Sequence, residues 1–332
     1  MAALGFSQVS GSQQSIELGK VQWQRQFDQA LDAAKQNGKP LFILFQEVPG
    51  CATCRNYGQQ VLSHPLLVEA IETLFVPLAI HNNKQGADAK VLKYYGEPAW
   101  NNPVVRIVGA DRQDLIPRLN GNYSRLGLVE AMIFALQRAE QDIPAYLELL
   151  REEWQAAHLG TETATLSMYC FWTGEKTYGQ LDGVVRTQAG FMHGREVVEV
   201  EYNPTVVSLE SLIEKGKAAS CADQVFVANV DQKNKAAKAI DQNKIKTSSS
   251  FRPDSEPKYY LSKTHYQYVP MTELQAARAN ALVGQGKSPE QVLSIRQREM
   301  ADYVRQHSSK LWKSRIGEGF LEAWEDMERG GF

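Results

Sequence analysis

The chain has few cysteines, almost no net charge and no long apolar run. Only four of its 332 residues are cysteine, too few for a disulfide scaffold of this size. Such sparse use fits a reducing compartment, where cysteines take part in chemistry rather than crosslink the fold. The formal net charge of −2 gives no electrostatic reason to expect nucleic acid or an anionic membrane as a partner.

Segments that would enter a membrane or direct secretion are also missing from the pattern. No run approaches the roughly 20 apolar residues that a bilayer-spanning helix needs. Residues 1–19 are rich in Ser and Gln and show neither a basic start nor an apolar stretch. We therefore expect a cytoplasmic protein, although a chain from which a leader had already been removed would look the same.

The length of 332 residues favours two domains of roughly 100–200 residues each. A hydrophobic share of 43% is enough to give each of them its own core. A helical pattern stops at Gly160 and a strand pattern restarts at Ala164, which marks the best boundary. We predict a first domain, a linking helix, a second domain and a helical C-terminal extension over residues 20–142, 143–162, 163–285 and 286–332.

The first half alternates helical patterns with short apolar runs, which is typical of an α/β domain. Residues 20–39 have helical periodicity and end in a glycine-then-proline stop. The continuous apolar run Leu41–Phe45 follows, as expected of a buried central strand. Further apolar runs predict strands near residues 75–80 and 103–108.

Cys51 and Cys54 form a Cys-x-x-Cys pair between that central strand and a predicted helix. In this position the first thiol is exposed and the helix N-terminus stabilises its thiolate, while the second lies one turn along. Such a pair passes between dithiol and disulfide, with Cys54 resolving a mixed disulfide formed at Cys51. A structural or metal-binding pair is the alternative, but no histidine flanks it and we expect no metal.

This half resembles the thioredoxin family over residues 20–140. The resemblance rests on the first helix, the Gly38–Pro40 stop, the apolar strand, the Cys-x-x-Cys pair and a proline, Pro103, that opens a later strand. It implies a thioredoxin-like α/β fold in which Pro103 is cis and packs against the dithiol. The family usually has an aromatic residue before the first cysteine, where this chain has Gly50, so the redox potential and partner choice are open.

Another cysteine lies in the run Tyr169–Trp172, which closes an apolar strand and opens a helix. Backbone N–H groups and the positive end of a helix dipole favour the thiolate of a cysteine placed there. Phe171 and Trp172 would add an aromatic wall beside it. Taken alone, Cys170 would be interpreted as a small buried residue and the two aromatic rings as core.

The run at Cys170, followed by Glu175, resembles the signature of A-type peptide methionine sulfoxide reductases. Residues Gly194–Pro204 resemble that family's acidic residue, alternating strand and proline turn. Two later segments, Tyr259–Tyr260 and Thr264–Tyr268, resemble its aromatic end. The resemblance covers about residues 163–270 and implies an α+β two-layer catalytic domain ahead of the helical tail.

The resemblance makes Cys170 the nucleophile and Glu196 the acid that protonates the sulfoxide oxygen. A sulfoxide sulfur accepts a thiolate only when its oxygen is protonated or strongly hydrogen-bonded, which explains why the chemistry needs both groups. Phe171 and Trp172 would form the apolar cup for the S-methyl group of the substrate.

Two further roles follow from the same resemblance. Attack by Cys170 leaves a sulfenic acid, and Cys221 is the other cysteine in that half that can resolve it to a disulfide. The family's usual insertion, which brings a tyrosine to the sulfoxide oxygen, is missing, and its later Asp and second Tyr are not recognisable. We predict that Tyr266 or Tyr268 supplies the hydroxyl instead.

The implied activity is thiol-dependent reduction of methionine S-sulfoxide, free or in peptides, without a cofactor. The Cys51–Cys54 pair would recycle the oxidised Cys170. An external thiol reductant, such as a thioredoxin or thioredoxin reductase system, would then regenerate the pair. Two alternatives stay open, a general thiol–disulfide oxidoreductase and a redox sensor without reductase activity.

Overall fold

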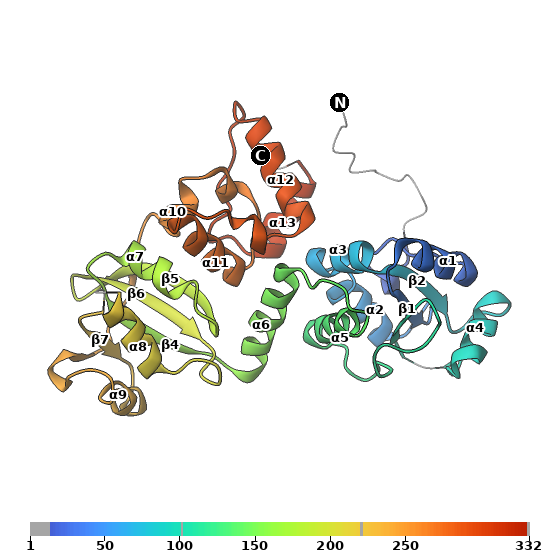
Figure 1. Cartoon of the computed structure of the whole chain (residues 1–332), viewed down its shortest axis with the longest axis horizontal. Coiled ribbons are helices and arrows are strands. Elements are labelled where there is room, and N and C mark those ends of the chain that lie inside the picture. The colour runs from blue at the N-terminus through green and yellow to red at the C-terminus, as the bar shows by residue number, and fades with distance from the viewer. Residues whose placement is uncertain (1–13, 101, 220–221, 331–332) are drawn as a thin grey trace. The chain divides into compact units, whose positions relative to one another are not determined.

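The computed structural model describes residues 14–100, 102–219 and 222–330 of the chain (Figure 1). It divides into two compact units, Met1–Arg151 and Glu152–Phe332. The division falls within helix α6 (Ala145–Leu159), in the segment that we predicted to link two domains. The predicted domain limits themselves remain predictions.

The first unit is built on a three-stranded mixed sheet. Strand β1 (Leu41–Gln46) lies at its centre, parallel to β2 (Val76–His81) and antiparallel to β3 (Val104–Val108). Every residue of β1 is buried. The predicted central strand is therefore where the continuous apolar run placed it.

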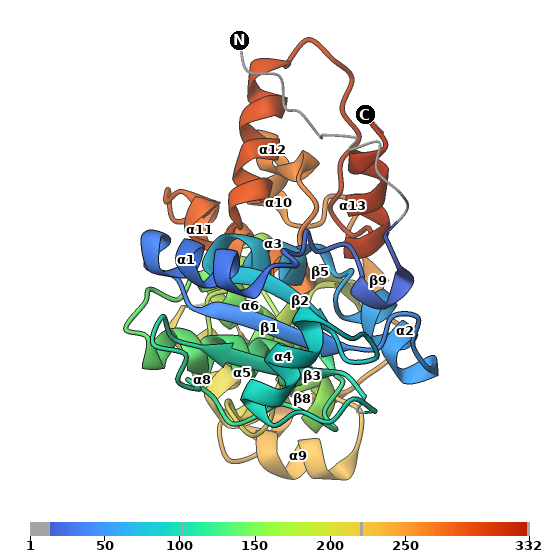
Figure 2. The same cartoon turned by 90° about the vertical axis from the view of Figure 1, so that its right-hand side faces the viewer.

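Helices pack on both faces of this sheet (Figure 2). They are α1 (Phe27–Asn37), α2 (Ala52–Gln60), α3 (Pro65–Leu74), α4 (Ala87–Tyr95) and α5 (Arg125–Arg138), after a short 3₁₀ turn η1 (Ile16–Leu18). Ile43 of β1 belongs to one apolar cluster with residues of α1 and α4, whereas the ring of Phe42 contacts Phe75. Because side chains alternate along a strand, a strand covered on both sides must be apolar throughout.

The second unit contains a six-stranded sheet with the strand order β8-β7-β4-β6-β5-β9. Strands β5 and β6 form a hairpin whose turn residues, His193 and Gly194, both have positive φ. Such a turn matches the twist of the flanking strands and favours glycine. The strands are β4 (Glu162–Ser167), β5 (Val184–Met192), β6 (Arg195–Tyr202), β7 (Val225–Val227), β8 (Ile245–Thr247) and β9 (Arg252–Pro253).

The core of this unit forms where helices α7 (Phe171–Tyr178) and α8 (Leu209–Ala218) pack on the sheet. Tyr178 of α7 and Leu212 of α8 join one buried cluster with Val198 of β6. The remaining helices are α9 (Val230–Ala236), α10 (Tyr259–Ser262), α11 (Glu273–Gly284), α12 (Ile295–Gln306) and α13 (Phe320–Glu328), and the 3₁₀ turns are η2 (Gln242–Lys244), η3 (His265–Tyr268) and η4 (Pro289–Val292).

The C-terminal extension packs within the second unit. Its backbone is joined to the segment before α11 by a hydrogen bond from the N–H of Arg315 to the carbonyl of Gln267, at 2.8 Å. The side chain of Trp324 in α13 is only 1% exposed. Both units are mixed α/β structures, which confirms the predicted fold class, and no helix among the described residues has the length and apolarity to cross a membrane.

Candidate active sites

The first thiol site lies where β1 gives way to α2. Cys51 is the N-cap of α2 and is exposed, whereas Cys54, one turn along, is fully buried. Their Sγ atoms are 3.6 Å apart, so the pair is a reduced dithiol within reach of disulfide formation. The Sγ of Cys51 also donates a hydrogen bond to the Oδ1 of Asn102 at 3.4 Å.

The two thiols differ in acidity. A hydrogen bond from the backbone N–H of Cys54 holds the pKa of Cys51 below its usual value. Burial, together with the neighbouring Cys51, raises the pKa of Cys54 to about 11. The exposed sulfur therefore ionises first, and the buried one keeps its proton, which is the division of labour that an attacking and a resolving thiol need.

The loop before Cys51 depends on glycine at position 50. A Cβ atom there would lie 2.5 Å from the carbonyl oxygen of Glu47 and 2.7 Å from the Cβ of Cys54. The N–H of Gly50 donates to the Oε1 of Glu17, a buried carboxylate, at 2.9 Å. The glycine that stands in place of the usual aromatic residue is thus required for the loop to pass against Cys54.

The cis bond predicted before Pro103 is not found there. Among the described residues the cis peptide bond is Val48–Pro49, in the loop that leads to Cys51. Pro103 directly precedes β3, a position that tolerates proline because no N–H of that residue is needed for strand pairing. The prediction of a cis proline at this position was therefore wrong.

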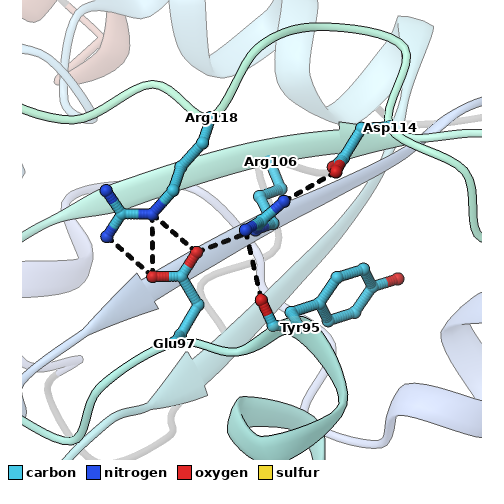
Figure 3. A network of polar contacts seen from close by, with 5 residues as sticks. All are labelled: Tyr95, Glu97, Arg106, Asp114 and Arg118. Carbon is cyan, nitrogen blue, oxygen red and sulfur yellow. Dashed lines mark hydrogen bonds and ion pairs between the residues drawn. The ribbon is translucent and has the colours of Figure 1, made fainter.

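Ion pairs anchor the buried Glu97, which lies in the segment between α4 and β3 (Figure 3). Glu97, whose side chain is 1% exposed, pairs with Arg106 at 2.8 Å and with Arg118 at 2.7 Å. Arg106 also pairs with Asp114 at 2.7 Å. Burial opposes the charge of Glu97, but the two guanidinium groups hold its pKa below its usual value.

The dithiol has one further chemical capacity. Glu47, Cys51 and Cys54 each offer a ligand atom, and these atoms lie within 4.8 Å of one another. Two thiolates and a carboxylate are a donor set that Zn²⁺ accepts. The described residues therefore include one group that could hold a metal ion, at the same place as the redox-capable pair.

The second thiol site lies at the N-terminus of α7. Cys170 is the N-cap of this helix and is half-buried. Antiparallel pairing of β4 with β6 continues past Ser167, where the N–H of Met168 donates to the carbonyl of Glu196 at 2.9 Å. The Oε2 of Glu196 then accepts the backbone N–H of Phe171 at 3.0 Å. The fold thus brings Glu196 to the helix terminus that Cys170 caps.

Aromatic rings line this terminus, including some that we did not predict. The ring of Phe171 meets that of Phe191 at a centroid distance of 5.3 Å. Trp172 stacks on Tyr259, with centroids 3.7 Å apart and planes 10° from parallel, and its Nε1 donates to Asp254 at 3.1 Å. The structure therefore adds Asp254 and Tyr259 as contacts of Trp172, the second residue after Cys170.

These two contacts could not be predicted from local patterns, because they join residues far apart in the sequence. Trp172 and Asp254, for example, are 82 positions apart. The contacts arise from the two-residue strand β9, which pairs with the end of β5 and brings Asp254 to the sheet edge. The sequence feature that pointed to this contact was the Tyr259–Tyr260 pair. It was part of the resemblance to the reductase family, but no role was assigned to it.

The predicted tyrosines make other contacts in the part of the chain that the structure describes. The hydroxyl of Tyr266 donates to the Oε1 of Glu290 at 2.7 Å, and burial together with this bond raises the pKa of Tyr266 to about 12. The ring of Tyr268 lies near that of Trp312, with a centroid distance of 6.4 Å. Cys221, the predicted resolving thiol, lies outside the described residues.

The chain is similar to two kinds of known protein. Residues 22–110 match a family model described as thioredoxin-like. A peptide methionine sulfoxide reductase of Drosophila melanogaster is 38% identical over 65 residues, which is 16% of this chain and 26% of the fly protein. The enzyme MsrA of Methanococcus maripaludis (strain C6) is 34% identical over 71 residues, 16% of this chain and 45% of the archaeal protein.

The chain thus spans less than half the length of these curated relatives. Among solved structures, the DsbH oxidoreductase is 18% identical with a TM-score of 0.32, covering 39% of this chain and 92% of its own. Mxr1 from Saccharomyces cerevisiae is 21% identical with a TM-score of 0.25, covering 29% and 77%. The chain combines a thioredoxin-like domain with a region similar to peptide methionine sulfoxide reductases, as the sequence predicted.

Proposed function

We propose that the chain reduces methionine S-sulfoxide to methionine, with Cys170 as nucleophile and the Cys51–Cys54 dithiol as the recycling centre. The observation that supports this most directly is the hydrogen bond between the carboxyl of Glu196 and the N–H of Phe171. It keeps a potential proton donor at the same helix terminus as the thiol. Reduction of a sulfoxide needs the thiolate at the substrate sulfur and the proton donor at the oxygen bonded to it.

The proposed first step consumes one proton and two electrons. The thiolate of Cys170 attacks the sulfoxide sulfur while Glu196 gives its proton to the oxygen. The bond that this attack forms between the two sulfur atoms then breaks, as the hydroxyl leaves the substrate sulfur for the cysteine sulfur. The sulfur–oxygen bond of the substrate is thereby broken, methionine leaves, and Cys170 holds a sulfenic acid. The substrate sulfur is reduced by two electrons and the cysteine sulfur is oxidised by the same number.

The proposed recycling returns those electrons. A second thiol, Cys221 or one of the dithiol pair, attacks the sulfenic acid, forms a disulfide and releases water. Thiol–disulfide exchange with Cys51 then leaves the oxidised pair at Cys51 and Cys54, and an external thiol reductant restores it. Fusion of the two centres in one chain gives this exchange an effective concentration of up to about millimolar.

A turnover assay on each epimer of methionine sulfoxide tests the proposal. With dithiothreitol as reductant we expect turnover of the S epimer in the wild type and none in Cys170→Ser. Cys51→Ser should keep the turnover driven by dithiothreitol and lose that driven by a thioredoxin system. Absence of wild-type turnover on both epimers, free and in a peptide, would refute the proposal.

A general thiol–disulfide oxidoreductase is the second candidate. The split acidity of the dithiol favours it, because the lowered pKa of Cys51 beside a Cys54 with a pKa of about 11 suits attack on many disulfides. Reduction of insulin disulfides without any sulfoxide turnover would select this function. Inactivity in both assays would leave Cys170 as an oxidisable sensor.

A further inference from the structure

A buried ion pair lies next to the Cys170 site. Glu175 on α7 has no exposed surface, and Lys258 is only 5% exposed. The Nζ of Lys258 donates to the Oε1 of Glu175 at 3.0 Å, and its backbone N–H donates to the Oε2 at 3.1 Å. The same Nζ also donates to the carbonyl of Thr187 on β5. One lysine thereby ties helix α7, strand β5 and the segment before α10 together.

Stability alone does not account for this pair. Lys258 has a φ of +53°, in the left-handed region that side chains other than glycine rarely occupy. Replacing a buried ion pair with apolar residues of similar volume is often neutral or stabilising, because two charges must be taken out of water. Strained residues of this kind persist where the surrounding structure needs a group in one position.

The segment that carries Lys258 contacts Trp172 through residues on either side of the lysine. Asp254, shortly before Lys258, accepts the indole Nε1–H at 3.1 Å, and Tyr259, the next residue, stacks on the indole at 3.7 Å. Glu175 lies about one turn after Trp172 on α7, so the two side chains leave the helix on the same side. The ion pair therefore links α7, which carries Trp172, to the segment from Asp254 to Tyr259, which contacts the indole.

We propose that the Glu175–Lys258 pair is a positioning device that holds Tyr259 against Trp172 and so fixes the plane of the indole near Cys170. Its effect on catalysis rests on the proposed sulfoxide reductase function, whereas its effect on the rings does not. An indole in one fixed plane offers a ready apolar surface to the S-methyl group of a substrate. A mobile indole must be ordered each time a substrate binds. This ordering weakens binding and lowers the fraction of bound substrate that is correctly oriented for reaction.

Three variants separate positioning from folding. Lys258→Met removes the cation and leaves Glu175 buried without a counter-charge. The double variant Glu175→Leu with Lys258→Met removes both charges, so we expect it to remain folded. The matched control is Lys235→Met, which deletes the lysine of a half-exposed ion pair with Glu162 at 3.1 Å.

The readout that does not depend on activity is the near-ultraviolet circular dichroism of Trp172. It is obtained by subtracting, for each protein, the spectrum of the same protein with Trp172→Phe. We expect the double variant to lose the band of the stacked indole while its thermal unfolding stays cooperative. Its kcat/KM for methionine S-sulfoxide should fall at least about tenfold, with a higher KM, and Lys235→Met should change neither property.

The outcomes distinguish this inference from the proposed function. An unchanged Trp172 band in the double variant overturns the positioning role, whatever the activity. A lost band in a protein whose wild type never reduced sulfoxide refutes the function and supports the positioning role. If the double variant does not fold, Glu175→Gln takes its place, since it keeps the size and one acceptor oxygen. A weaker band in that variant supports the inference, and an unaltered band contradicts it.

Discussion

The carboxyl of Glu196 accepts the backbone N–H of Phe171 at 3.0 Å, across 25 residues of sequence. Antiparallel pairing of β4 with β6 creates this contact. The end of β4 leads into Cys170 and lies beside the start of β6, which contains Glu196. The acid and the thiol expected from the sequence therefore meet at one helix terminus. Substitution of Glu196 tests whether they act together.

Replacing Glu196 with glutamine should abolish most sulfoxide turnover while preserving the fold. The amide oxygen can still accept the N–H of Phe171, but the side chain has no acidic proton to give. General acid catalysis typically contributes about 10²–10⁴-fold, so we expect a loss of at least about 100-fold in kcat with dithiothreitol. Glu199→Gln, on the same strand, is the control, and equal activity in Glu196→Gln and the wild type would rule out the acid role.

Alkylation should discriminate sharply between the two thiols of the dithiol. The lowered pKa of Cys51 gives it a larger thiolate fraction at neutral pH than an ordinary thiol, whereas Cys54, with a pKa of about 11, stays protonated. Iodoacetamide at pH 7 should therefore modify Cys51 first, and modification of Cys54 should rise only in alkaline solution. Mass spectrometry of the reduced protein measures both rates, and earlier labelling of Cys54 would contradict the geometry.

Gly50→Ala should disturb the dithiol loop. The new Cβ would meet the carbonyl of Glu47 at 2.5 Å, a separation that real Cβ atoms do not adopt, so the loop must move away from Cys54. We expect a destabilisation of about 1–3 kcal/mol in urea unfolding and a slower reduction of insulin disulfides. Gly319→Ala, where a Cβ meets open space, is the matched control. A Gly50→Ala protein as stable as the control would show that the loop tolerates a side chain.

The Glu97 cluster should make the stability of the first unit sensitive to acid. Because the pKa of Glu97 in the folded protein lies below its usual value of 4.5, its contribution is present above that value and is lost as the pH falls through the folded-state pKa. Glu97→Gln should cost about 2–3 kcal/mol at pH 7, since Arg106 and Arg118 keep partial access to water.

Denaturant unfolding at pH 7 and pH 3 tests this expectation. The difference between the wild type and Glu97→Gln should shrink at the lower pH, which lies below 4.5, because the carboxyl of the unfolded chain then takes up a proton. Asp114→Asn, which removes only the more exposed partner of Arg106, should have a smaller effect. A constant difference at both pH values would show that the charge of Glu97 is not what stabilises the segment.

Local patterns in the sequence were sufficient to predict the elements that bear both thiol sites. The apolar run Leu41–Phe45 became the central strand, and Cys51 and Cys170 each cap the helix that the pattern placed after them. These features depend on neighbours within a few residues, since burial periodicity and helix capping are local properties. Pro103 shows the limit, because the isomer of a proline bond depends on the packing around it, and the cis bond lies before Pro49 instead.

The sequence by itself determined where the sulfur atoms stand along the chain and which helices begin beside them. Only the tertiary structure decided which side chains surround Cys170. Asp254 and Tyr259 reach Trp172 through strand β9 and the Glu175–Lys258 ion pair, while Tyr266 is bound to Glu290. Strand pairing and buried charge join residues that are distant in sequence, and no local periodicity encodes such partners.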